Sequence, residues 1–159
     1  MEETDPKIKI GNLIRNKILR YELAILLVLV VATVLALFGA KSGILLTLFF
    51  TSLSALYFFS AFAVPLEEET SAFDLVILKI FALGSSIVTT GILFFIQSWP
   101  YSVIMLEIGS AAVFICLIPV IWKRFTNPLN KVYPGMFLIR ALVLLSLAIV
   151  LFVTGLLKS

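Results

Sequence analysis

Three ionisable side chains lie inside long apolar blocks of this 159-residue sequence: Lys79, Glu107 and Arg140. A charge near the centre of a bilayer costs at least ~2.5 kcal/mol on insertion scales, so such residues are the first candidates for a functional site. Lys79 and Arg140 have long stems, which can reach the headgroups from depths of roughly 9 Å and 6 Å. Glu107 has a short stem and lies roughly 9 Å below the opposite membrane surface. Glu107 is therefore the leading candidate, as a proton or cation ligand or as a partner contact.

Ion pairs among these charges depend on which membrane surface each residue is nearest. Asp74 lies in the first turn of the same predicted helix as Lys79, at the surface from which Arg140 also enters. We therefore expect an ion pair between Asp74 and Arg140. A Glu107–Lys79 pair is not expected, because about 10–13 Å would separate the two residues along the normal of a ~30 Å core.

The rest of the chain offers little catalytic chemistry. It has no histidine, which is the commonest general base and transition-metal ligand. Its one cysteine, Cys116, cannot form an intrachain disulfide or a CxxC metal site, and such a residue in an apolar block is typical of packing. We expect no enzyme activity, no metal and no cofactor, and the net charge of +3 does not indicate nucleic-acid binding.

The elements that position these residues follow from composition. Hydrophobic residues make up 62% of the chain and charged residues 13%, about half the charged share of a soluble domain. The apolar residues form blocks of about twenty, which as helices would cross a ~30 Å hydrocarbon core. The sequence predicts an all-α polytopic membrane protein whose transmembrane domain, 21–157, holds five helices: 21–39, 44–64, 73–97, 101–122 and 136–157.

Two local signals flank the spans. In segment 1–20, apolar residues recur at helical spacing among basic ones, which predicts an amphipathic helix in the headgroup region, or alternatively one that docks on a partner. After the acidic loop at 67–69, we expect Thr70 or Ser71 to cap the third span, with Asp74 in its first turn. The Ser98-Trp99-Pro100 break predicts a tight hairpin between the third and fourth spans.

The basic residues predict the orientation. Five lie in 7–20 and three in 123–131, whereas Lys41 and Lys158 are alone on the other side. The positive-inside rule then places the N-terminus in the cytoplasm and the C-terminus outside a cell (inner or plasma) membrane.

Small residues recur along the spans and would allow helices to approach closely. They are Gly84 and Gly91 in the third span, Gly109 in the fourth, and Ala141, Ala148 and Gly155 in the fifth. No span has a polar face wide enough to line a water-filled pore in a single copy.

Two hairpins resemble each other, at 32–62 and 89–117, and either form a parallel repeat or share only their apolar composition. The second hairpin carries Trp99-Pro100 and then Met105-Leu106-Glu107-Ile108-Gly109. With these motifs it resembles the hairpin of the gliding-motility motor protein GldL family, and 32–65 resembles it through the sequence LYFFSAFAVP. That family has a carboxylate a few residues after Ile-Gly, where this chain has Ser110 to Val113. The resemblance therefore implies the hairpin architecture and not the motor role.

A second resemblance, to the HdeD-type small multi-span membrane proteins, rests on short-turned hairpins and on residues 136–157.

Two functions remain open from the sequence. The first is a non-enzymatic structural or accessory subunit of a membrane complex, with the lipid bilayer, other membrane subunits or further copies of itself as partners. The second is an ion-coupled transport or motor-like element that uses Glu107.

Overall fold

The computed structural model of this chain describes residue 24 and residues 43–62, 71–126 and 135–156, with the side chains of the last range described from Phe137 to Val153. Within these ranges the protein is all-α. The predicted amphipathic helix, the first span apart from residue 24, the acidic loop at 67–69 and residues 127–134 of the predicted connector lie outside the described residues.

Four helices make up these ranges: α2 (Gly43–Ser60), α3 (Ala72–Ile96), α4 (Ser102–Thr126) and α5 (Gly135–Leu156). Each begins within one residue of the start predicted from the sequence. Two ends differ from the prediction. Helix α2 stops at Ser60, where Ala61 and Phe62 form a turn, whereas 64 was predicted. Helix α4 continues one turn past Trp122, because Thr126 donates its hydroxyl to the carbonyls of Trp122 and Lys123 and so completes a last turn.

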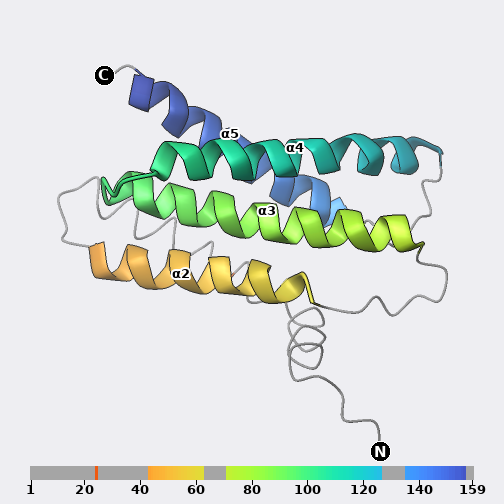
Figure 1. Cartoon of the computed structure of the whole chain (residues 1–159), viewed down its shortest axis with the longest axis horizontal. Coiled ribbons are helices and arrows are strands. Elements are labelled where there is room, and N and C mark those ends of the chain that lie inside the picture. The colour runs from red at the N-terminus through yellow and green to blue at the C-terminus, as the bar shows by residue number, and fades with distance from the viewer. Residues whose placement is uncertain (1–23, 25–42, 63–70, 127–134, 157–159) are drawn as a thin grey trace, which may run out of the picture.

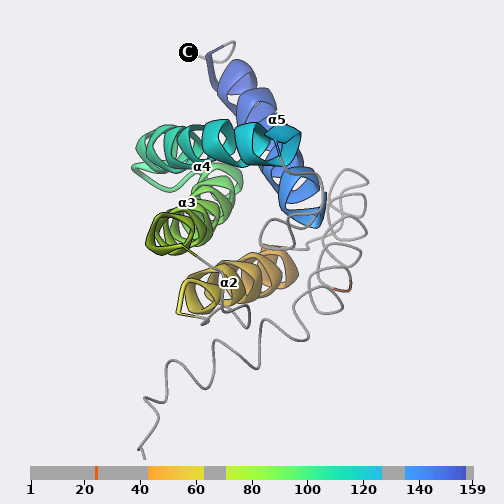
Figure 2. The same cartoon turned by 90° about the vertical axis from the view of Figure 1, so that its right-hand side faces the viewer.

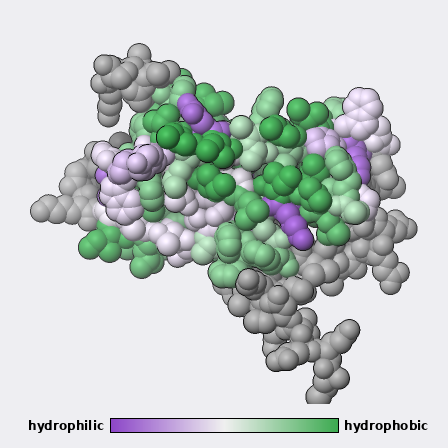
Figure 3. Space-filling view, in the orientation of Figure 1, coloured by the Kyte–Doolittle hydropathy of each residue, from purple (hydrophilic) through white to green (hydrophobic). Residues whose placement is uncertain are grey.

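Helices α2, α3 and α4 are each long and apolar enough to cross a membrane, and the apolar run described in α5, Phe137–Val153, is shorter. Hydrophobic residues cover most of the face shown in Figure 3, and hydrophilic residues form small separate groups on it. Exposed aromatic residues mark both ends of α4, with Tyr101 just before its start and Trp122 and Phe125 near its end. The count of five spans and the orientation of the termini stay predictions.

Helix α3 lies between α2 and α4, and the three run side by side in alternating directions (Figure 1). Helix α5 crosses this layer obliquely and packs on α3 and α4 (Figures 1 and 2). The aromatic rings of Phe81 and Phe137 stack at this crossing, with centroids 3.6 Å apart. Helix α3 is therefore the central helix, since it contacts each of the other three described helices.

The tight hairpin predicted between the third and fourth spans is confirmed. Ser98 adopts a left-handed backbone with φ of 55°, and its N–H donates to the carbonyl of Phe95 at 3.1 Å. The N–H of Trp99 donates to the carbonyl of Phe94 at 2.8 Å, and the two aromatic rings meet edge to face at 4.9 Å. This is a Schellman motif with its hydrophobic contact, formed around serine instead of the usual glycine. It ends α3 and turns the chain directly into α4.

Candidate functional site

The beginning of α3 holds a carboxylate that is almost fully buried. Asp74 lies in the first turn, and only 6% of its side chain is exposed. Of the two predicted capping residues, Thr70 and Ser71, Ser71 is the N-cap. Its Oγ accepts from the N–H of Asp74 at 3.2 Å and donates to Oδ2 of Asp74 at 2.7 Å. A carboxylate in this position also interacts favourably with the positive end of the helix dipole.

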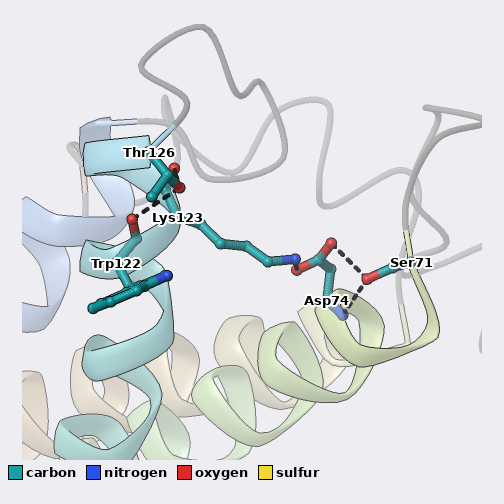
Figure 4. A network of polar contacts seen from close by, with 5 residues as sticks. All are labelled: Ser71, Asp74, Trp122, Lys123 and Thr126. Atoms are coloured by element: carbon teal, nitrogen blue, oxygen red, sulfur yellow. Dashed lines mark hydrogen bonds and ion pairs between the residues drawn. The ribbon is translucent and has the colours of Figure 1, made fainter.

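Lys123 from α4 completes this group. Its Nζ lies 2.5 Å from Oδ1 of Asp74, and Figure 4 shows the lysine stem extended from α4 toward the start of α3. The ammonium also lies 5.7 Å from the ring centroid of Phe73. The Ser71–Asp74–Lys123 group therefore ties the beginning of α3 to the end of α4, and the predicted pair of Asp74 with Arg140 stays a prediction.

Sequence reasoning missed Lys123 as the partner, although a signal was present. Asp74 and Lys123 lie at equal distances along the chain from the Ser98–Trp99 turn. An antiparallel hairpin with a tight turn brings such positions level with each other, so the hairpin alone could have predicted this pair.

The Arg140 side chain contacts the last turns of α2. Its guanidinium carbon is 5.0 Å from the ring centroid of Tyr57, which is one turn before the end of α2 and 1% exposed. A guanidinium over an aromatic face gains a cation–π interaction, which is stronger where water is excluded. The Arg140 side chain is thus partly buried and reaches from α5 to the Tyr57 ring of α2.

Lys79 is exposed on α3 and lies close to the end of α2. Hydrogen bonds from Ser54 to Ser86 and Thr90 fix the register of these antiparallel helices. In that register Ser60, the last residue of α2, is level with residues 80–84 of α3. Lys79 therefore lies just beyond the last turn of α2, where a cation is favourable for the helix dipole. This position is consistent with the predicted structural role of Lys79.

Glu107 points away from the other described helices. It is exposed, whereas Leu106 and Gly109 beside it are buried against α3. The nearby outward residues are apolar and include Ile104, Ile108 and Phe114, which are 50%, 58% and 59% exposed. Within the described residues Glu107 takes part in no ion pair or hydrogen bond. The three candidate charges therefore do not form one site, and Glu107 is alone on its face.

The small residues of the predicted packing stripes lie between helices. A Cβ added to Gly109 would be 2.7 Å from the backbone nitrogen of Val88, and one added to Gly91 would be 3.0 Å from that of Leu106. Gly84 faces Ala112, and Ala141 and Ala148 of α5 are buried. Gly155 lies outside the residues whose side chains are described. The backbones of α3 and α4 thus approach each other closely at Gly109 and Gly91.

A second polar group, which the sequence did not reveal, joins α2 to α3. The Ser54 hydroxyl is 2.9 Å from Oγ of Ser86 and 2.8 Å from Oγ1 of Thr90, and the Ser86 hydroxyl donates to the Ser54 carbonyl at 3.0 Å. Nearer the hairpin, Gln97 donates through Nε2 to Oγ1 of Thr47 at 3.0 Å. The only sign in the sequence is a series of hydroxyl residues on both helices, which does not specify partners.

Replacing Ser54 with alanine is expected to lower the free energy of unfolding by about 0.6–1.7 kcal/mol, the range for interhelical hydrogen bonds in membranes. Ser52→Ala is the matched control, because Ser52 is exposed and bonds only to the Leu48 carbonyl of its own helix. Reversible unfolding in mixed micelles measures both variants. Equal effects of the two substitutions would mean that the Ser54 contacts do not stabilise the bundle.

The described residues thus define an all-α protein with three helices able to cross a membrane. They contain no group of three or more metal-binding side chains. Comparisons with protein-family models, with curated proteins and with solved structures found no match to this chain. The resemblances to the GldL family and to the HdeD-type proteins stay predictions.

Proposed function

We propose that this protein is a non-enzymatic structural or accessory subunit of a membrane complex, and that it contacts its neighbour through the outward face of α4. This α4 face consists of Glu107 with Ile104, Ile108, Ala111 and Phe114. The proposal also includes the multi-pass topology in a cell membrane, with a cytoplasmic N-terminus and an outer C-terminus.

One observation carries this proposal: Glu107 is exposed in the middle of an apolar helix face. The other polar groups described above have roles inside the bundle, since Asp74 pairs with Lys123 and Ser54 bonds across to α3. Glu107 has no such role, and a carboxyl group facing lipid tails is unfavourable. A helix from a neighbouring subunit would cover the carboxyl and supply its hydrogen bonds.

The proposal is tested by photo-crosslinking in native membranes. A photoreactive residue at position 108 is expected to give a discrete crosslinked product, which is lost when Glu107 is replaced by leucine. Position 149 on α5 is the matched control, since Ile149 is 62% exposed and Ile108 is 58% exposed. Equal crosslinking from both positions, or none from 108, would contradict the proposed contact.

The alternative, an ion-coupled transport or motor-like element, makes a different prediction for Glu107→Gln. A proton flux in liposomes that depends on Glu107 would support that alternative and count against a purely structural role. We expect liposomes that contain the wild-type protein and the variant to have the same flux.

A further inference from the structure

We infer that the α4 face docks on a transmembrane helix that carries one lysine or arginine at the depth of Glu107. The inference rests on the proposed function and names the chemistry of the partner.

The α4 face carries one charged side chain, Glu107. Between Ser102 and Trp122, Glu107 is the only charged residue of α4. It is exposed and has no ion pair or hydrogen bond within the described residues. A partner helix without a charged residue would leave the Glu107 carboxylate desolvated without compensation. A partner helix with a basic side chain at the same depth would supply both the opposite charge and hydrogen-bond donors.

A second polar group without a hydrogen-bond partner among the described residues lies beside Glu107. Ser110 is one turn further along α4, and its Oγ is buried without a hydrogen-bond partner among the described residues. Residues three apart on a helix are neighbours, so a rotation of this side chain brings the hydroxyl within reach of the Glu107 carboxylate. Ala111 is exposed on the same face, and its small side chain permits close approach of a second helix backbone. The Ser110 hydroxyl can then donate to the Glu107 carboxylate, and the remaining lone pairs of that carboxylate are available to an external partner.

A second copy of this chain is a poorer occupant of the face. Copies related by an axis along the membrane normal bring Glu107 to the same depth as Glu107, which places like charges together. The intramembrane cations of the described helices lie toward the opposite end of the bundle, with Arg140 beside Tyr57 and Lys79 just beyond α2. Neither reaches the level of Glu107 in a parallel neighbour. Among the described residues, a parallel copy therefore offers no basic side chain at this level, and we assign the complementary charge to a different chain.

The test uses the full-length protein in nanodiscs and designed polyleucine transmembrane helices. Each helix carries a single arginine, glutamine or leucine about 9 Å from its outer end, at the depth of Glu107. Energy transfer between labels measures the association. We expect the arginine helix to bind about 3- to 20-fold more tightly than the leucine helix, and Glu107→Gln to abolish this preference.

A charge-shifted variant provides the matched control. Glu107→Ile combined with Ile118→Glu moves the carboxylate about 16 Å along the same helix face, because Ile118 is three turns away and 60% exposed. This variant is expected to lose its preference for the original arginine helix and to prefer one whose arginine is moved by the same distance. Loss of folding would remove both preferences, and circular dichroism of the variant distinguishes that case.

Three results would overturn the inference: equal binding of the arginine and leucine helices, a preference that survives Glu107→Gln, or wild-type self-association that Glu107→Gln abolishes. The last would identify a second copy as the occupant. Each is measured without flux or native partners. The inference can therefore fail while the crosslink from position 108 persists, and a Glu107-dependent flux would contradict the proposed function separately.

Discussion

Replacing Gly109 with alanine is expected to lower the free energy of unfolding by about 2 kcal/mol, within the usual range for overpacking. The new Cβ would lie 2.7 Å from both the backbone nitrogen and Cγ2 of Val88 on α3. A side chain could rotate away, but the backbone of a helix cannot, so α3 and α4 must separate. The gain in helix propensity from glycine to alanine, about 1 kcal/mol, offsets only part of this cost.

Gly43→Ala is the matched control for Gly109→Ala. Among the described residues, a Cβ at Gly43 would meet only Nε2 of Gln97, at an ordinary distance of 3.8 Å, so a change of at most about 0.5 kcal/mol is expected. Gly91→Ala should be intermediate, since its nearest atom is the Leu106 backbone nitrogen at 3.0 Å. Unfolding with sodium dodecyl sulfate in mixed micelles, followed by circular dichroism, gives the ranking. If Gly109→Ala were as stable as Gly43→Ala, the close approach of α3 and α4 would be wrong.

The four described helices could be predicted well from the sequence because apolar blocks and chain breaks are local signals. The starts of α2 to α5 follow from where each block begins. The helix ends were harder to predict, because a helix need not stop at the residue where the hydropathy of the sequence falls. A helix usually ends before a proline, so Pro65 sets only a limit for the end of α2. The helix ends earlier, at the turn formed by Ala61 and Phe62. Helix α4 extends past its apolar block to Thr126, beyond the contact of Lys123 with Asp74.

The contacts between helices were less predictable, because they depend on register and on rotation about each helix axis. The depth of Glu107 follows from counting residues, but the side it faces follows from the packing of Gly109 on α3. At 100° per residue, a side chain two positions before Gly109 points nearly the opposite way, out of the bundle. The contact of Arg140 with Tyr57 could not be predicted for a related reason: it depends on the position of α5 against the other helices, where Phe137 stacks on Phe81, and no local pattern encodes that position.

The second large effect is expected at the Ser71–Asp74–Lys123 group. Asp74→Ala should lower the free energy of unfolding by about 2–3 kcal/mol, less than the loss of a fully buried pair, because Lys123 is one third exposed. The substitution leaves the ammonium without its carboxylate and removes the acceptor of the Ser71 hydroxyl. Lys123→Met should cost less, about 1–2 kcal/mol, since Asp74 keeps its bonds to Ser71 and the helix dipole.

A double-mutant cycle isolates the pair itself. If Asp74 and Lys123 stabilise each other across the hairpin, the Asp74→Ala/Lys123→Met variant should be more stable than the sum of the single losses by about 1–2 kcal/mol. Lys79→Met is the control, because Lys79 is an exposed lysine of α3 with no ion pair in the described part of the chain, and it should change stability by less than about 0.5 kcal/mol. Additive losses in the cycle would show that the pair contributes nothing and that Asp74 acts only as part of the α3 cap. Coupling would instead show that the ion pair holds α3 and α4 together at the open end of their hairpin. The Ser98 turn joins the two helices at the other end.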